Sequence, residues 1–258
     1  MLKPGKLRGR VALVTGGARG IGLEIVRRFL ADGYQVAFIA TRAEHVERAL
    51  GLLSCPEDRL YAERIDVTRQ NEVGGFVERI RARWGEIAIL VNNAGISPKR
   101  VDQNAPWLSQ TSLEEWARVI DVNLNGAFIL TRLLAPAMIA KGYGRIINVG
   151  SLAGRAMPLI AGPHYAASKA GLVGLTRAAA RDLAPHGTTV NCIAPGRVLS
   201  DLTGPPEAAI NVSALSRIPV GRFGTAEEVA HVAAFLASPM AGFITGATID
   251  ITGGEFAG

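Results

Sequence analysis

The feature that most constrains the fold is a glycine-rich turn between an apolar run and an amphipathic segment near the N-terminus. Val11–Thr15 is short, apolar and rich in β-branched residues, which predicts a buried parallel strand. Gly16, Gly20 and Gly22 follow with G-x-x-x-G-x-G spacing, and a helix is expected over Leu23–Leu30. Glycines let the backbone approach a pyrophosphate, and a helix N-terminus attracts its negative charge. The turn therefore favours a dinucleotide site over a plain tight turn.

The rest of the chain alternates between short apolar runs and longer amphipathic segments. Further strands are expected at Gln35–Ala40, Leu60–Ile65, Ile87–Val91, Gly144–Val149, Val190–Ile193 and Ile244–Asp250. Further helices are expected at Ala43–Leu53, Gln70–Arg83, Ser112–Ile139, Tyr165–Ala184 and Thr225–Leu236. Pro136 is expected to kink or break the helix that contains it. Because no change in composition marks a boundary, we predict one α/β domain over residues 1–258: a doubly wound (Rossmann) parallel sheet of seven strands with helices on both faces.

Composition supports a large core and excludes several classes of protein. Hydrophobic residues make up 48% of the 258 residues and charged residues 19%, far from the profile of a disordered chain. No apolar run reaches the ~20 residues that span a bilayer, and Met1–Gly5 lacks the apolar core of a secretion signal. Cys55 and Cys192 have no metal-ligand spacing. We expect a cytoplasmic protein with no metal site and no membrane partner.

The basic charge of the chain raises the question of a nucleic-acid partner. The net charge is +6 and the isoelectric point is about 9.7. Arg79, Arg81 and Arg83 look like a cluster, but on a helix Arg81 points away from the other two. Because no basic stripe or nucleic-acid motif is present, we expect no nucleic-acid partner.

The end of the second strand bears on the choice of cofactor. An acid at this point in a dinucleotide fold holds a ribose hydroxyl, whereas an arginine accepts a 2′-phosphate. This chain has Thr41 and Arg42 after the strand, and Arg19 in the glycine turn is a second cation near the same place. The pattern favours NADP over NAD, although NAD stays open. The alternative is that Arg42 is a solvated residue that opens the next helix.

Tyr165 and Lys169 stand four residues apart, and so share one face of a helix. A phenol with its ordinary pKa of about 10 is a poor acid or base at neutral pH. A fixed ammonium nearby would stabilise the phenolate and lower that pKa. The alternative is a half-buried tyrosine beside a solvated lysine.

Polar side chains follow several of the predicted strands, at the edge where parallel sheets bind ligands. Asn92 and Ser151 stand at two such ends, and Asn92 could instead join neighbouring strands. Asp66, after the third strand, could accept a hydrogen bond from an adenine or cap the following helix. Asn123 is unusual because asparagine is unfavourable inside a helix. His164 is expected to form hydrogen bonds in a loop rather than to act in catalysis.

Two irregular stretches are expected to lie near this edge. Ser97–Gln110 contains proline and is expected to cover the site. Ser112 and Glu115 have the spacing of a capping box at the start of the next helix. Residues 197–220 are rich in Pro, Ser and Gly, and are expected to form a flexible lid over the substrate.

Taken in order, these motifs resemble the short-chain dehydrogenase/reductase family over nearly the whole chain. The motifs are Thr15–Gly22, Asn92–Gly95, Asn123, Ser151, Tyr165–Lys169 and Pro195–Gly196. The chain is most similar to the 3-oxoacyl-[acyl-carrier-protein] reductase branch, through Ala40-Thr41, Val149–Ser151 and Phe243–Thr248. Ser97–Gln110 is longer than the loop typical of that branch, which keeps other substrates open.

The resemblance implies a role for each catalytic residue. Tyr165 would be the acid in carbonyl reduction and the base in alcohol oxidation. Lys169 would lower the pKa of Tyr165 and hold the nicotinamide ribose, and Ser151 would hydrogen-bond the carbonyl oxygen. Asn123 would hold a water in a break of its helix. The implied cofactor-binding residues are Gly16, Arg19, Gly20, Ile21, Gly22, Thr41, Arg42, Asp66, Val67, Asn92, Gly95, Tyr165, Lys169, Pro195, Gly196 and Val198.

The resemblance also implies the reaction and the assembly. The expected activity is hydride transfer between NADP(H) and a carbonyl or secondary alcohol, with a 3-oxoacyl thioester on acyl carrier protein or CoA as the favoured substrate. The alternative within the family is an alcohol, sugar or polyol dehydrogenase. A cofactor-binding regulator without catalysis is a different class, and the intact Ser151, Tyr165 and Lys169 speak against it. A homotetramer is implied.

Overall fold

The computed structural model describes residues 10–100, 105–158, 160–199 and 209–258. Parts of the expected N-terminal segment, the loop at 97–110 and the lid at 197–220 lie outside these residues. Within them, seven strands form one parallel sheet in the order β3-β2-β1-β4-β5-β6-β7. The strands are β1 (Val11–Thr15), β2 (Gln35–Ala40), β3 (Leu60–Arg64), β4 (Ile87–Asn92), β5 (Gly144–Val149), β6 (Thr188–Pro195) and β7 (Thr248–Ile251).

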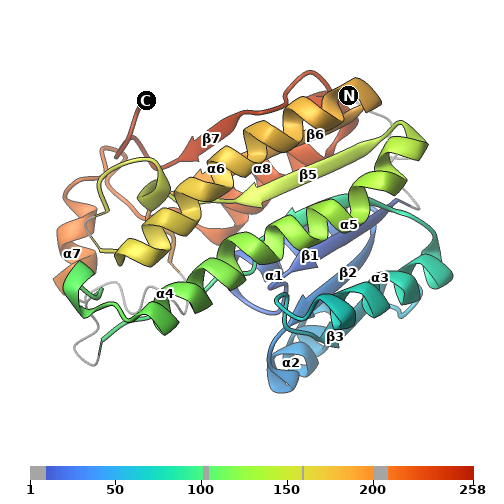
Figure 1. Cartoon of the computed structure of the whole chain (residues 1–258), viewed down its shortest axis with the longest axis horizontal. Helices are drawn as coiled ribbons and strands as arrows, with labels where there is room; N and C mark the ends of the chain where they lie inside the picture. Colours follow the sequence, from blue (N-terminus) through green and yellow to red (C-terminus); the bar gives the residue numbers. More distant parts are fainter. Residues whose placement is uncertain (1–9, 101–104, 159, 200–208) are drawn as a thin grey trace.

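Helices cover both faces of this sheet. They are α1 (Gly20–Ala31), α2 (Ala43–Leu53), α3 (Gln70–Trp84), α4 (Leu113–Ile120), α5 (Gly126–Lys141), α6 (Pro163–Leu183), α7 (Ala209–Leu215) and α8 (Ala226–Ala237). One hydrophobic cluster packs α1, α2 and α8 on the sheet, and a second packs α3, α5 and α6 on the other face. Figure 1 shows α5 and α6 in front of the sheet and α8 behind it. The predicted fold class is confirmed.

The central strands are buried on both faces, which explains their unbroken apolar sequence. All five residues of β1 are buried, and Leu13 aligns with Ala37 of β2 on one side and with Leu90 of β4 on the other. The chain winds outward from β1 to β3 and then returns to β4 on the opposite side of β1. The strand order therefore reverses between β1 and β4, where open α/β sheets bind ligands.

The helix expected over Ser112–Ile139 consists of α4, a π-helical turn η3 (Asp121–Asn125) and α5. We expected Pro136 to kink or break its helix. The prediction of a break was wrong, because α5 continues through Pro136 to Lys141. Pro136 has no backbone N–H, so one carbonyl oxygen of the preceding turn has no partner within the helix. Pro136 lies on the exposed side of the helix, where water can hydrogen-bond such a carbonyl. Buried Leu134 and Met138 hold the opposite side against the core.

The helix Leu113–Lys141, formed by α4, η3 and α5, also bears on membranes. It is the one helix in the described ranges long and apolar enough to cross a bilayer by length and composition alone, with a mean hydropathy of 1.4. Its buried residues Leu130, Leu134 and Met138 belong to the cluster that covers the sheet. Helices that pack in the core of a globular domain can meet the same criterion of length and composition.

Several element boundaries differ from those expected. Helix α6 begins at Pro163, so His164 lies in its first turn rather than in a loop. Strand β6 is longer than predicted and β7 is shorter. Helix α7 lies inside the segment expected to be a lid, and α8 begins with a capping box formed by Thr225 and Glu228.

Candidate active site

A cavity of about 570 Å³ lies at the edge of the sheet where the strands end. Most of the residues expected at a dinucleotide and carbonyl site line it. They are Gly16, Arg19, Gly20, Ile21, Gly22, Thr41, Arg42, Val67, Gly95, Ser151, Tyr165, Lys169, Pro195, Gly196 and Val198. Asp66, Asn92 and Asn123 are not on its wall. The folded chain thus brings together residues from both ends of the sequence.

The glycine turn after β1 is packed too tightly for side chains. Gly16 and Gly20 have φ values of +65° and +52°, which glycine adopts most readily. A Cβ at Gly22 would lie 2.2 Å from the Gly16 carbonyl oxygen. Asn93 donates its side-chain N–H groups to the carbonyl oxygens of Thr15 and Gly16, at 3.0 and 3.1 Å. The turn is therefore a rigid, backbone-lined cradle.

Helix α1 begins in this cradle without a side-chain cap. Arg19 occupies the N-cap position and makes no capping hydrogen bond, and the first turn contains no acidic residue. The free N–H groups and the positive end of the helix dipole therefore face the cavity. Backbone N–H groups beside a side-chain-free turn fit the pyrophosphate of a dinucleotide.

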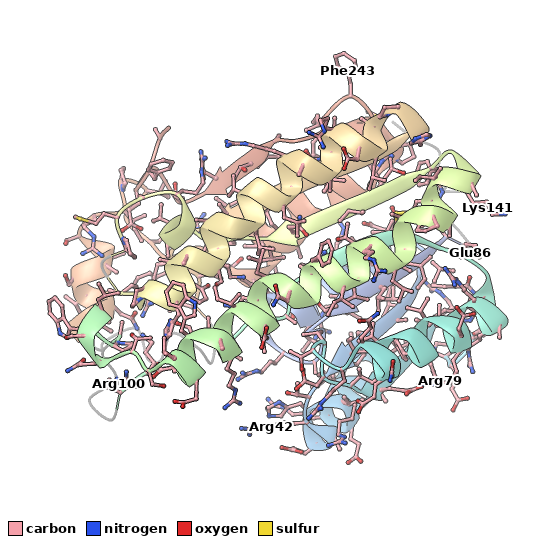
Figure 2. All side chains as sticks on the ribbon, viewed as in Figure 1. Arg42, Arg79, Glu86, Arg100, Lys141 and Phe243 are labelled. Carbon is pink, nitrogen blue, oxygen red and sulfur yellow. The ribbon has the colours of Figure 1, made fainter. Side chains whose placement is uncertain are left out.

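Basic side chains stand at the end of the cavity beside β2. Arg42 lies at the start of α2 (Figure 2), with 67% of its side chain exposed and its guanidinium 4.0 Å from the Glu44 carboxylate. Arg19 is exposed nearby on the turn, and His45 also lines the cavity. Sequence reasoning missed His45, which lies in the first turn of α2, three residues after the N-cap residue Arg42.

Ser151, Tyr165 and Lys169 meet on the opposite wall. Tyr165 shares a side-chain hydrogen bond with Ser151. The Ser151 hydroxyl is itself oriented by accepting the Ala153 backbone N–H at 3.2 Å. Lys169 is buried, donates its Nζ to the Val149 carbonyl oxygen at 2.7 Å, and lies 5.6 Å from the centre of the Tyr165 ring. The hydroxyl pair is assembled, with the ammonium behind it.

The electrostatics of this wall differ from the expectation. Burial raises the pKa of Tyr165, and the hydrogen bond with Ser151 lowers it in part. Burial lowers the pKa of Lys169 to about 8, with the nearby Cys192 thiol opposing this shift. The lysine therefore does not depress the tyrosine pKa in this structure, because its ammonium points to a backbone carbonyl and burial dominates both groups.

Asn123 lies behind this wall, in the π-helical turn η3. Its Oδ1 accepts the Ile96 N–H at 2.8 Å, and its Nδ2 donates to the Ile96 carbonyl and to Ser168 Oγ, both at 3.0 Å. A Cβ at Gly95 would lie 3.4 Å from both Asn123 Oδ1 and Lys169 Nζ. The helix irregularity is confirmed, and a water held between these groups stays a prediction.

Comparison with known proteins agrees with this geometry. The family model described as "Enoyl-(Acyl carrier protein) reductase" matches residues 16–255. The Escherichia coli (strain K12) 3-oxoacyl-[acyl-carrier-protein] reductase FabG is 38% identical over 96% of this chain and 98% of its own length. The Rhizobium meliloti acetoacetyl-CoA reductase is 41% identical over the same shares of the two chains.

The chain belongs to the short-chain dehydrogenase/reductase family.

Solved structures support the same assignment. A Brucella melitensis 3-oxoacyl-[acyl-carrier protein] reductase superposes with a TM-score of 0.90 at 32% identity, covering 100% of this chain and 97% of that one. A Serratia marcescens short-chain dehydrogenase/reductase mutant superposes at 0.89 with 34% identity, covering 97% and 99%. The chain is therefore an oxidoreductase that acts on C=O or CH–OH groups with a nicotinamide cofactor.

Two residues expected to bind cofactor in this dehydrogenase/reductase face elsewhere. Asn92 donates its Nδ2 to Asn148 Oδ1 at 2.8 Å and to Thr131 Oγ1 at 3.3 Å, so its side chain joins β4 to β5 and α5. Asp66 accepts the Thr68 N–H at 2.9 Å in the turn before α3. The alternative interpretation of Asn92, that it joins neighbouring strands, accounts for its contacts. The alternative interpretation of Asp66 was wrong, because the N-cap residue of α3 is Arg69 and has no side-chain cap. The cofactor roles of Asn92 and Asp66 stay predictions.

A part-buried hydrogen bond between His164 and Glu115, beside Tyr165, was not predicted. His164 is fully buried, and its Nδ1 accepts the Tyr165 backbone N–H at 2.7 Å, so its Nε2 donates to Glu115 Oε1 at 2.9 Å. Glu115 Oε2 pairs with Arg100 Nη1 at 3.0 Å, and these bonds lower the pKa of Glu115, the His164 bond most. Ser112 caps α4 as expected, but Glu115 does not complete the capping box.

Proposed function

We propose that the chain reduces 3-oxoacyl thioesters, carried on acyl carrier protein or CoA, with NADPH. The observation that carries this proposal is that Ser151, Tyr165 and Lys169 line the same cavity as the glycine cradle. The curated relatives named as 3-oxoacyl-[acyl-carrier-protein] reductase and acetoacetyl-CoA reductase support the substrate class.

The chemistry divides between the cofactor and the chain. The bound nicotinamide supplies the hydride. Ser151 donates a hydrogen bond to the carbonyl oxygen, where negative charge develops. Tyr165 donates the proton to that oxygen. Because burial raises the pKa of Tyr165, the phenol is protonated at neutral pH and holds the proton that the reduced oxygen takes up.

NADPH is the proposed cofactor because cations gather where the ribose of the adenine end would lie. Arg42 and Arg19 are both exposed there, and the imidazole side chain of His45 also lines the cavity. A Brucella melitensis relative, 33% identical, has NAD in its crystal structure, so NADH is the cofactor to compare. Arg42→Ala is expected to weaken NADPH binding about tenfold and NADH binding little, since a charged hydrogen bond to phosphate is lost. Equal weakening of both would contradict this choice.

The cavity wall favours an acyl substrate over a sugar. A putative gluconate dehydrogenase from Agrobacterium tumefaciens superposes with a TM-score of 0.88 at 31% identity, which makes a sugar or polyol dehydrogenase the alternative. The wall beyond Tyr165 contains Met157, Pro158, Ile160 and Ala161. These side chains offer an acyl chain apolar contact, whereas a polyol would need hydrogen-bond partners.

A substrate panel tests the proposed function. Purified protein is assayed with acetoacetyl-CoA, acetoacetyl thioesters, gluconate and simple polyols, each with the reduced or oxidised forms of both cofactors. Acetoacetyl thioesters with NADPH should give the highest kcat/KM. A higher kcat/KM for gluconate or a polyol would support the alternative instead.

We also propose a homotetramer in the cytoplasm. Exposed hydrophobic side chains on α5 and beside β7, such as Phe128 and Phe243, would be covered by assembly. Figure 2 shows Phe243 projecting from the surface. Analytical ultracentrifugation should give four times the 27.2 kDa chain mass, and a monomer would contradict the assembly.

A further inference from the structure

Besides the glycine turn, the lining of the cavity contains two chemically different sets of residues, an apolar wall and a basic wall. One is apolar, formed by Ala153, Ala156, Met157, Pro158, Ile160 and Ala161. The other carries three basic residues and one acid, Lys99, Arg197, Arg217 and Glu255. These residues come from the connections after β4 and β6 and from the C-terminal tail. They are separate from Arg19 and Arg42 beside β1 and β2.

The basic residues of this wall differ in their hydrogen-bond and ion-pair partners. Arg217 Nε lies 3.3 Å from Glu255 Oε1, so those two charges offset each other. Arg197 Nε donates to Oδ1 of Asn211, a buried and uncharged side chain, at 2.8 Å. Lys99 makes no hydrogen bond or ion pair with any residue in the described ranges. A cationic amine therefore stands on the cavity wall without an acid of its own.

Arg197 also acts on Lys99. Burial, and then the positive charge of Arg197, lower the pKa of Lys99. Burial lowers the pKa of Arg197 as well; Glu255 opposes this shift and Arg217 adds to it by a smaller amount. Two like charges in a partly desolvated cavity disfavour each other, and an anion between them would relieve the repulsion and restore solvation to both.

We propose that Lys99 and Arg197 form a subsite for a negatively charged group of the carbonyl substrate, either a carboxylate or a phosphate. This inference rests on the proposed function, because it takes Tyr165 as the reacting end of the cavity. The apolar wall would hold the carbon chain while the basic wall holds the anion. Two sources share this chemistry: the phosphate of a pantetheine carrier arm and the carboxylate of an oxo acid.

The test uses carbonyl compounds that share one reacting group and differ in charge. Acetoacetyl-CoA carries phosphates, acetoacetate carries a carboxylate, and acetoacetyl-N-acetylcysteamine is uncharged. For Lys99→Met, kcat/KM for a charged substrate relative to the uncharged thioester should fall about tenfold, and Lys99→Glu should lower the ratio further. Lys141→Met, at the exposed end of α5 far from Arg100 and its neighbour Lys99 in Figure 2, is the matched control and should leave the ratio unchanged.

The pattern of the loss identifies the anion. A fall confined to acetoacetyl-CoA supports a phosphate, and a fall confined to acetoacetate supports a carboxylate. An unchanged ratio for both charged substrates overturns the subsite. Weaker NADPH binding by Lys99→Met, measured by fluorescence titration, also overturns it, because Lys99 would then serve the cofactor.

Calorimetry separates this inference from the proposed function. Binding of acetoacetyl-CoA and acetoacetate is measured with the NADP⁺-loaded protein, which has no hydride to transfer and therefore cannot reduce them. If wild-type protein reduces no 3-oxoacyl compound but binds one of these anions about tenfold more tightly than Lys99→Met does, the proposed function fails and the subsite stands. Equal affinity of wild type and variant for both anions overturns the subsite alone.

Discussion

The two halves of the cavity are built by different means. The nucleotide half consists of backbone: the turn after β1, the start of α1 and the end of β2, where a Cβ at Gly22 would collide with another main-chain atom. The substrate half consists of side chains from long connections, held by contacts such as His164–Glu115, whose partners lie 49 residues apart. The first half is rigid and easily recognised in a sequence, whereas the second depends on which segments the fold brings together.

Replacing Tyr165 with Phe should give the largest difference between the two halves: turnover should be lost while cofactor binding is kept. The variant keeps the ring and loses only the hydroxyl that donates the proton, so kcat should fall by about 10²- to 10⁴-fold. The nucleotide half is untouched, and the Kd for NADPH should stay within about twofold of the wild-type value, which fluorescence titration measures. Lost cofactor binding would instead mean that Tyr165 holds the structure of the site.

Lys169 lies between the two halves, and its titration should appear in the stability of the fold. In the unfolded chain the lysine keeps its proton up to about pH 10.5, whereas in the folded protein its pKa is about 8. Folding therefore releases a proton between these values, and stability should rise with pH from about 8 to 10.5. Compared with Lys169→Met, which cannot titrate, the wild type should gain at most about 3 kcal/mol.

Chemical denaturation of both proteins across this range measures the difference. Other groups titrate in both proteins alike and largely cancel from the comparison. If the free energies of unfolding of the two proteins change with pH in parallel, burial does not disfavour the charged form of Lys169.

Replacing Gly22 with Ala should damage the nucleotide half and spare the chemistry of the other. The new Cβ would lie 2.2 Å from the Gly16 carbonyl oxygen and 2.5 Å from Asn93 Nδ2, so the turn must shift, at a cost of about 1–3 kcal/mol. NADPH affinity should fall accordingly. Gly51→Ala is the control, because nothing lies within 4 Å of its Cβ and alanine favours a helix by about 0.5–1 kcal/mol. Equal free energies of unfolding for Gly22→Ala and Gly51→Ala would contradict the tight packing of the glycine turn.

Replacing Glu115 with Gln tests the side-chain contacts of the substrate half. The amide carries no charge to offset Arg100 and accepts a weaker hydrogen bond from His164 Nε2, so the support behind the Tyr165 backbone weakens. We expect kcat to fall about tenfold and its pH profile to change, with NADPH affinity unaffected. Glu114→Gln, an exposed neighbour on the same helix, should change neither. If both variants behave alike, the network plays no part in positioning Tyr165.

The difference between the halves also explains what the sequence could predict. The strand before Gly16 and the tyrosine–lysine pair depend on local spacing, which is readable without coordinates. His164 was placed in a loop because the helix was expected to begin at Tyr165. Its partner Glu115 was missed because Glu115 looked like part of a capping box with Ser112. The pKa of Tyr165 was expected to fall because sequence spacing shows that Lys169 is near, but not that its ammonium is directed to the Val149 carbonyl.

A crystal structure with NADPH bound tests the central claim most directly, because it shows whether one ligand joins both halves. The account predicts the pyrophosphate at the Gly16–Gly22 turn, the 2′-phosphate beside Arg42, and the nicotinamide ring between Val198 and the Tyr165 hydroxyl. A nicotinamide ring remote from Tyr165, or a Tyr165 hydroxyl turned out of the cavity and away from Ser151, would contradict it.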